Sequence, residues 1–247
     1  MNLFADAIAW LLDPANWGGP SGIAARLLQH LAVSAVVLVI AAVIALPVGG
    51  LIGHTGRGKQ LAVMVSGGLR ALPTLGVLTL FGLWLGIGLR APVLALVILA
   101  IPPLLAGAYA GFESVDRRTV DAARAMGMRE TQIVGKVELP IGLPIVVGGI
   151  RSAALQVIAT AMLVAYLADV GLGRFIFEGL KTRDYAQMLG ASLLVILLAL
   201  VVDGAFALLQ RLVTPTGVRL ARSARTGGEP ARTRTPARRT ITEGNPV

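Results

Sequence analysis

Five long apolar runs, separated by short polar segments, dominate the pattern of this chain. They lie at about 28–53, within 61–89, at about 91–112, within 141–167 and at about 188–213. A transmembrane helix needs about 20 mainly apolar residues, so each run can span a bilayer. The pattern predicts an all-α integral membrane protein with a transmembrane domain at 28–213, an N-terminal segment at 1–27 and a C-terminal tail at 214–247.

Two of the five predicted spans contain residues that interrupt helices. The second contains Arg70, Pro73, Thr74 and Gly76, and the fourth begins with Pro140, Pro144, Gly148, Gly149 and Arg151. Such residues are tolerated in a membrane where neighbouring helices or a water-filled path satisfy the freed backbone groups. The interruptions therefore favour a transport path, to which Pro73 and Thr74 would contribute, over a passive anchor.

Three charged side chains fall inside the predicted spans: Arg70, Arg151 and Asp203. Charges are costly in lipid, so these side chains should face the interior of the bundle or reach for the interface. A structural salt bridge from Asp203 to Arg70 or to Arg151 is the simplest expectation. A direct role in the transport path and snorkelling to the interface are the alternatives.

The overall composition supports the membrane assignment and excludes several kinds of chemistry. Of the 247 residues, 14% are charged and 55% are hydrophobic, whereas a soluble domain carries about 25% charged residues. The mean hydropathy is +0.78. No cysteine is present, and His30 and His54 are far apart in the sequence, so we interpret them as ordinary interfacial residues. We expect no metal site and no cofactor.

The basic residues predict the orientation in the membrane. Fifteen of the 22 Lys and Arg side chains lie after the first span, after the third span or from Arg211 onward. Basic loops stay in the cytoplasm, which places the N-terminus outside and the C-terminus inside. Segment 1–27 lacks the basic start of a signal peptide, and its Trp10 and Trp17 suit the membrane interface.

The tail explains the high net charge without invoking nucleic acid. From Arg211 onward, eight Arg and two Glu account for +6 of the net charge of +9. The tail has few apolar residues and no aromatic residue, which predicts disorder near anionic lipid headgroups. No nucleic-acid-binding motif is present, so membrane lipid and not nucleic acid is the expected partner.

The stretch "GHTGRGKQ" at 53–60 resembles a phosphate-binding loop but lacks its essential features. Gln60 stands where Ser or Thr would hold Mg²⁺, and an apolar membrane span precedes the stretch instead of a buried strand. Paired catalytic carboxylates, a zinc-protease motif and a serine elbow are also missing from the sequence. We therefore expect no enzymatic activity, and ATP-driven work would need a second protein.

A polar elbow at 116–140 lies between the third and fourth spans, on the cytoplasmic side by the charge rule. Thr119 is suited to cap a helix that starts at Val120, with Asp121 in its first turn. Val120, Ala123, Met126 and Gly127 would share one face of this helix. Gly127 should end the helix, a second short helix should run through 129–138, and Leu139 and Pro140 should turn the chain back into the membrane. The result would be a compact knob joined to two spans.

The elbow resembles the EAA signature of bacterial ABC-importer permeases. The matching residues are Asp121-Ala122-Ala123, then Gly127 after three residues, then Val137, Glu138, Leu139 and Pro140 after nine more. Asp121 replaces Glu and Val137 replaces Ile. The resemblance implies a type I ABC-importer permease fold with a cytoplasmic coupling helix. The coupling residues would be Asp121, Ala122, Ala123, Arg124, Gly127, Met128, Leu139 and Pro140.

Further segments resemble the permeases of osmoprotectant importers, the glycine betaine/carnitine/choline branch. They include "RALPTLGVLTL", "GIRSAALQVIATAMLVAYL" and "GLGRFIFEGLKTRDYAQMLGA", and together they cover most of 10–213. Asp169, in "ADVG" at 168–171, departs from the run of glycines usual in that branch. This carboxylate would face outside, where it would affect the contact with a binding protein or favour a different cationic solute.

The resemblance also implies the partners and the location. A second permease chain, identical or paralogous, would complete the path in the bacterial inner membrane. Cytoplasmic ABC ATPase subunits would hold the elbow, and an extracytoplasmic solute-binding protein would dock on outer loops that include 168–187. The alternatives are a methionine or sulfonate ABC permease and an ion-coupled secondary transporter or channel that uses Arg70, Arg151 and Asp203. A membrane enzyme is a third alternative, but the sequence contains no set of residues that would form a catalytic site.

Overall fold

The computed structural model describes residues 2–214, and within them the chain is helical with no strand. Four segments are long and apolar enough to cross a membrane, and a bent helix pair gives a fifth when it is counted as one span. The long segments are α2 (Ile23–Thr55), α5 (Arg90–Glu113), the continuous stretch Glu130–Tyr166 and α10 (Tyr185–Leu212). This confirms the predicted all-α membrane fold. The expected disorder of the basic tail concerns residues 215–247, which lie outside the described part of the chain.

The second predicted span is broken where its proline indicated. Helix α3 (Lys59–Ala71) ends before Leu72 and Pro73, whose extended backbone leads into α4 (Thr74–Leu85). The two helices meet at 85°. Proline disfavours a helical conformation in the residue before it, which explains why the break falls at Leu72.

The predicted interruption of the fourth span is wrong. Helix α8 (Leu139–Thr160) runs without a break through Pro144 and Gly149, and it continues a helical path from α7 (Glu130–Ile133). Pro140 is the second residue of α8, which follows a π-helical turn directly. A π-helical turn, η2 (Val134–Glu138), joins α7 to α8. Leu139 and Pro140 therefore continue a helix and do not turn the chain.

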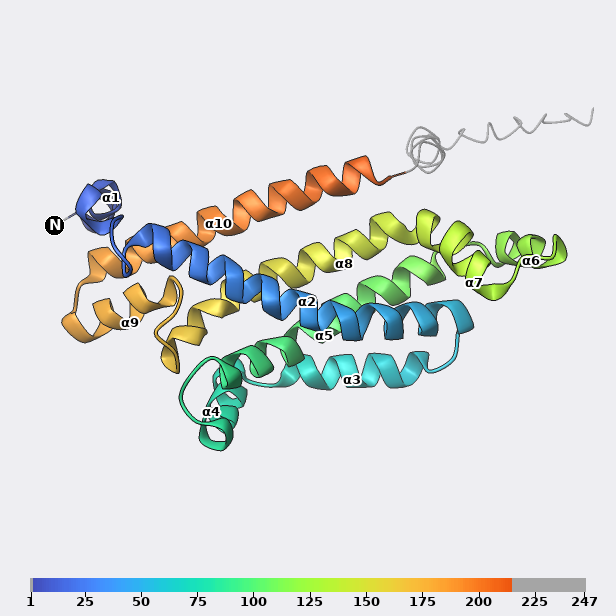
Figure 1. Ribbon diagram of the computed structural model, residues 1–247, viewed down its shortest axis with the longest axis horizontal. Coiled ribbons are helices and arrows are strands. Elements are labelled where there is room, and N and C mark those ends of the chain that lie inside the picture. The colour runs from blue at the N-terminus through green and yellow to red at the C-terminus, as the bar shows by residue number, and fades with distance from the viewer. Residues whose placement is uncertain (1, 215–247) are drawn as a thin grey trace, which may run out of the picture. The chain divides into compact units, whose positions relative to one another are not determined.

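Helix α5 forms the centre of the bundle, with α2 packed on one side and α8 on another (Figure 1). The shared core consists mainly of small and branched aliphatic side chains: Val37, Ala41, Ala45, Leu96, Ala100, Leu104, Ala153 and Val157. The α5–α8 crossing is closer still: Gly107 lies against the backbone of Gly149, and Gly142 lies against the backbone of Gly111. Small residues permit such close helix packing in membranes.

The N-terminal segment forms a helix that packs on the bundle. Helix α1 (Leu3–Leu12) contacts α10, and the Trp10 ring meets the Phe175 ring edge-on at a centroid distance of 5.2 Å. Phe175 belongs to α9 (Gly173–Thr182). A short 3-10 turn (Pro14–Asn16) then leads towards α2, and a second one (Ala161–Tyr166) follows α8.

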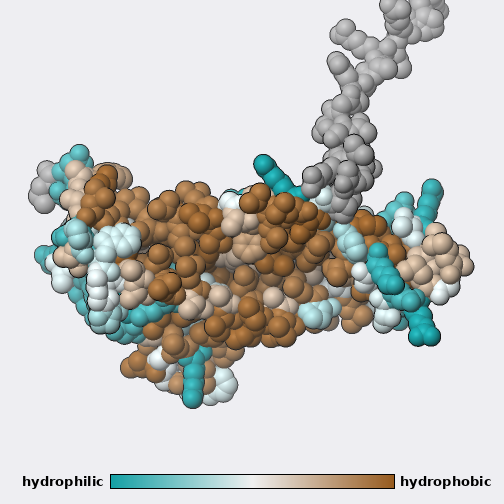
Figure 2. All heavy atoms as spheres, turned by 45° about the horizontal axis from the view of Figure 1, so that its top comes forward, coloured by the Kyte–Doolittle hydropathy of each residue, from teal (hydrophilic) through white to brown (hydrophobic). Residues whose placement is uncertain are grey.

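Apolar side chains cover the middle of the face shown in Figure 2, and hydrophilic side chains gather at its two ends. The exposed apolar residues include Val36, Val39 and Val43 of α2 and Leu197 and Leu200 of α10. An apolar surface of this kind suits contact with lipid. Helices α1 and α9 lie at one end of the bundle, and α6 (Arg117–Ala125) and α7 lie at the other (Figure 1).

Candidate coupling elbow and pathway groove

The first helix of the elbow starts earlier than the sequence suggested. Asp116 caps α6, and its carboxylate accepts a hydrogen bond of 2.9 Å from the backbone N–H of Arg118. The predicted cap, Thr119, lies inside the helix. Asp and Thr both cap helices well, but the extended backbone falls at Asp116. Asp121 consequently lies in the second turn of α6 and not in the first.

Gly127 ends this arm of the elbow as predicted. Its φ of +81° lies in the left-handed region that other residues avoid. The N–H of Gly127 donates to the Arg124 carbonyl at 2.9 Å, and the N–H of Met128 donates to the Ala123 carbonyl at 3.2 Å. These bonds satisfy carbonyls at the end of α6, a common form of helix C-cap.

The elbow has a small hydrophobic core of its own. Val115, Val120, Ala123 and Ile133 are buried together, and Met128 and Val137 pack against them. Contrary to the prediction, these residues do not share one face of the helix: Val120, Ala123, Met126 and Gly127. The first two point inward, whereas Met126 is 76% exposed and Gly127 lies open.

The proposed coupling residues are accordingly of two kinds. Asp121, Ala122, Arg124 and Gly127 are exposed on α6 and its end, where another protein can reach them. Ala123 is buried and Met128 is half-buried, so they shape the elbow from within. Leu139 and Pro140 are exposed at the start of α8, beyond the elbow's core.

Charged side chains connect the elbow to the end of α2. Arg124 forms ion pairs with Asp121 at 2.9 Å and with Glu130 at 2.7 Å. The carboxylate of Glu130, and to a lesser degree that of Asp121, raises the pKa of the exposed Arg124 guanidinium. A second oxygen of Glu130 lies 3.1 Å from His54 Nε2, and a Glu138 oxygen lies 2.6 Å from His54 Nδ1.

Sequence reasoning missed this part of the site, and the histidine interpretation needs correction. His54 is not an isolated interfacial residue, because both ring nitrogens contact carboxylates of the elbow region. His30 is not interfacial in the ordinary sense either: it is buried, and its Nε2 lies 3.0 Å from the Ile158 carbonyl oxygen. In the sequence, the feature that could have identified Glu138 as a site residue is its position directly before Leu139-Pro140.

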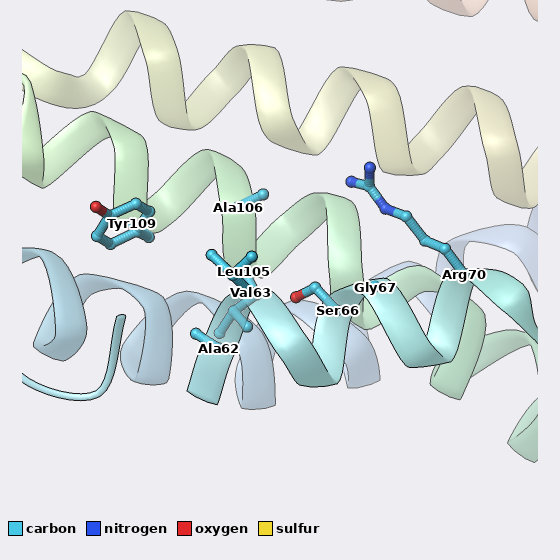
Figure 3. Close-up of a pocket in the computed structure, with 8 residues that line it drawn as sticks. All are labelled: Ala62, Val63, Ser66, Gly67, Arg70, Leu105, Ala106 and Tyr109. Atoms are coloured by element: carbon cyan, nitrogen blue, oxygen red, sulfur yellow. The ribbon is translucent and has the colours of Figure 1, made fainter. Parts of the chain in front are cut away.

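The second candidate site is a groove between α3 and α5 (Figure 3). Its volume is about 280 Å³, and its lining residues are Ala62, Val63, Ser66, Gly67, Arg70, Leu105, Ala106 and Tyr109. Arg70 is exposed there, and within residues 2–214 no carboxylate pairs with it. Pro73 and Thr74 lie just beyond Arg70, at the bend between α3 and α4.

The other two intramembrane charges pair with each other. Arg151 of α8 donates to both carboxylate oxygens of Asp203 of α10, at 2.5 and 2.6 Å. The structural salt bridge expected for Asp203 is therefore confirmed, with Arg151 as the partner and not Arg70. A paired arrangement of this kind lowers the cost of placing both charges at membrane depth.

Asp169, the residue that departs from the glycine run, has a structural partner. Its carboxylate lies 2.8 Å from Arg26 at the start of α2, and its backbone carbonyl accepts a second bond from Arg26 at 2.6 Å. Arg174 lies 3.1 Å from the same carboxylate oxygen. Asp169 thus ties the loop before α9 to α2.

Comparisons with known proteins agree with this architecture. Residues 41–215 match the family described as binding-protein-dependent transport system inner membrane component. The carnitine transport permease protein OpuCB of Listeria monocytogenes is 34% identical over 201 residues, which cover 81% of this chain and 91% of that protein. The osmoprotectant import permease protein OsmW of Salmonella typhimurium is 31% identical over 222 residues, covering 87% of this chain and 100% of that protein.

A solved structure shows the same fold. A chain of the MetNI methionine ABC transporter, in an inward-facing conformation, superposes with a TM-score of 0.68 over 84% of this chain and 98% of its own. Its sequence identity is 22%, so this likeness concerns the fold alone. The type I ABC-importer permease fold is thereby confirmed. This chain belongs to the family of binding-protein-dependent transport system inner membrane components, the permeases of ABC importers.

Proposed function

We propose that this chain is the permease subunit of an ATP-driven importer of osmoprotectants, small quaternary ammonium solutes such as carnitine, glycine betaine or choline. The observation that carries the proposal is the similarity to two permeases named for carnitine and osmoprotectant transport, which extends over more than four fifths of this chain. The methionine transporter shares the fold at lower identity, so methionine is the weaker alternative.

The elbow at 116–140 is the proposed coupling element. A cytoplasmic ATPase would receive its exposed surface, formed by Asp121, Ala122, Arg124 and Gly127. The compact core beneath that surface supports the proposal, because a knob must be stiff to pass on a displacement. The elbow continues directly into α8 and follows α5 closely, so its movement would reach two spans without a long relay. The inner end of the protein would then be the end that carries α6.

The groove beside Arg70 is the proposed contribution of this chain to the transport path. Arg70 lies at about the middle of a span, and no carboxylate among residues 2–214 pairs with it. Such a guanidinium is costly in lipid, so it should face water or a second permease chain. The break at Pro73 and Thr74 supports the same assignment, since irregular backbone at membrane depth lines cavities or protein interfaces. Arg151 and Asp203, which pair with each other, would stabilise the α8–α10 contact beside this path.

Reconstitution tests the proposed function. The chain is assembled in proteoliposomes with its ATPase, its solute-binding protein and any second permease chain encoded beside it. Uptake of radiolabelled carnitine, glycine betaine and choline is measured with ATP or with a non-hydrolysable analogue inside. We expect ATP-dependent uptake of at least one of these solutes. If the complex takes up methionine and none of the three osmoprotectants, the proposed substrate class is wrong. Gradient-driven uptake without ATP would overturn the ABC mechanism.

A further inference from the structure

The cytoplasm-proximal end of α2 is joined to the elbow by side chains alone. Helix α5 leads into the elbow and α8 leads out of it, but α2 ends some 60 residues earlier in the sequence. At this end Gly56 adopts a left-handed conformation and closes the helix. The guanidinium of Arg117, the first residue of α6, donates to the carbonyls of His54 at 2.9 Å and Gly53 at 3.1 Å.

His54 makes the second connection, through both nitrogens of its ring. Nδ1 lies 2.6 Å from Glu138, and Nε2 lies 3.1 Å from Glu130. The ring of His54 therefore lies between two carboxylates of the elbow region and contacts both of them at once.

Glu138 is a buried carboxylate that has its ion-pair contact with His54. Its side chain is 1% exposed, and His54 is the one ionic partner that the structure records for it within residues 2–214. A buried carboxylate left without a partner is strongly destabilising. Glu130, by contrast, is 54% exposed and shares its charge with Arg124. The two carboxylates thus have different tasks: Glu138 anchors His54, and Glu130 links it to the surface of the elbow.

The π-helical turn brings these two carboxylates to the same histidine. Glu130 opens α7 and Glu138 closes η2, eight residues later. In a regular α-helix, side chains eight residues apart differ by about 80° around the axis. The π turn holds an extra residue per turn, so Glu138 returns towards the side that carries Glu130. Single π turns are frequent at functional sites.

Asp121, Arg124, Glu130, His54 and Glu138 form a continuous chain of contacts from the exposed surface of α6 to the buried base of α8. Each link is 3.1 Å or shorter. We propose that His54 is the positioning residue that couples α2 to the elbow: its imidazole ring holds Glu130 and Glu138 at once, so that α2 moves together with α5 and α8 when the ATPase displaces the elbow. This inference rests on the proposed coupling function of the elbow.

The decisive variant is His54→Gln, which keeps a polar side chain of similar size but removes the imidazole ring that contacts both carboxylates. We expect the complex to assemble and to hydrolyse ATP, while uptake per ATP hydrolysed falls about tenfold, within the usual range of coupling energies. His54→Arg supplies a forked guanidinium that can bridge both carboxylates, and it should restore most of the uptake. If His54 only filled space, His54→Gln would retain more uptake per ATP than His54→Arg.

Lys59→Gln provides the matched control. Lys59 pairs with Glu113 at 2.8 Å on the exposed surface just after α2, and both side chains are about half exposed. Its loss removes one positive charge from the same end of the bundle without touching the elbow. Surface pairs of this kind contribute little, so uptake per ATP should match that of the wild type.

A transport-independent measurement covers the case in which His54→Gln fails to assemble. Glu130→Gln is half exposed and leaves the His54–Glu138 contact in place, so it should fold. We expect faster hydrogen exchange in 130–138 of the assembled complex and a lower uptake per ATP than in Lys59→Gln. Unchanged coupling in His54→Gln, failure of a folded His54→Arg, or unchanged exchange and uptake in Glu130→Gln would each overturn the proposal.

Solute uptake by the wild-type complex tests the proposed transport function separately from the role of His54. If it imports none of the three osmoprotectants, the proposed substrate class fails. The role of His54 is then tested with the solute that the complex does import, and hydrogen exchange in 130–138 tests the contact without any solute. Equal behaviour of variant and wild type in these measurements would refute the role of His54 whatever the cargo.

Discussion

The close crossing of α5 and α8 gives a sharp prediction for Gly149→Ala. A Cβ atom at position 149 would lie 2.6 Å from the Cα of Gly107, 3.3 Å from its nitrogen and 3.2 Å from the Pro103 carbonyl oxygen. All three are backbone atoms, so no side chain can rotate away to make room. Carbon atoms in contact normally stand about 3.5–4.0 Å apart. The two helices would therefore have to separate by about 1 Å at the crossing.

The expected loss of stability follows from two opposing effects. Overpacking a well-packed core costs about 1–3 kcal/mol, and the gap opened between the helices weakens the packing around it. Replacing Gly by Ala in the interior of a helix contributes up to about 1 kcal/mol in the other direction. Gly204 of α10 supplies the control, because a Cβ there meets no atom within 4 Å. The difference between Gly149→Ala and Gly204→Ala isolates the cost of the crossing, about 1–3 kcal/mol.

Thermal unfolding of the purified protein in detergent measures this difference. For a chain of this length, 1 kcal/mol corresponds to a shift in Tm of about 2–4 °C. We expect Gly149→Ala to unfold several degrees below the wild type and Gly204→Ala to unfold at or above it. Equal Tm values for the two variants would show that α5 and α8 do not approach at Gly107 and Gly149, and the arrangement of the bundle would have to be revised.

Three further predictions concern the elbow and the ion pairs. Gly127→Arg should abolish uptake while the chain still inserts, whereas Gly127→Asn, which tolerates the left-handed conformation, should retain more uptake in the same proteoliposome assay. Asp203→Asn should reduce the yield of folded protein by leaving Arg151 unpaired; adding Arg151→Gln should recover part of that yield, and no recovery would argue against the pair as the cause. Asp169→Gly should lower Tm with little effect on solute preference; a changed preference would instead indicate a direct contact with solute.

The sequence was sufficient to predict the spans and the outline of the elbow. The spans follow from length and hydropathy alone, because in lipid a single segment can satisfy all of its backbone hydrogen bonds only as a helix. The end of α6 at Gly127 was predictable, since glycine at that point supplies the left-handed turn. These features depend on residues that are neighbours in the chain, which is why local rules identify them.

The features that sequence reasoning missed depend on which helices become neighbours. Asp116 and Thr119 are both suitable caps, and the choice between them accompanies the burial of Val115 and Val120 in one small core. Asp203 had two candidate partners, but Arg70 lies on α3, which packs on α5, while Asp203 lies on α10, beside α8. The bundle topology decides the pairing.

His54 illustrates the same limit over a longer distance. Its partner Glu138 is 84 residues away in the sequence, and the contact exists because α2 and α8 both pack against α5. The proline-rich start of α8 suggested a break that would have moved Glu138 away from α2. The π turn instead keeps the path helical through this region. No local rule anticipates a π turn, so the site could not be assembled from the sequence.

Helix α2 is held by charges at both ends and by small residues between them, and this arrangement favours rigid-body motion. At one end Arg26, itself buried, binds the carboxylate and the carbonyl of Asp169. At the other end His54 and Arg117 fix the last turn to the elbow region. Between them, α2 packs closely on α5 without interruption by its own proline. With contacts at both ends and close packing along α5, α2 should carry a displacement of the elbow to the loop before α9 at the opposite end.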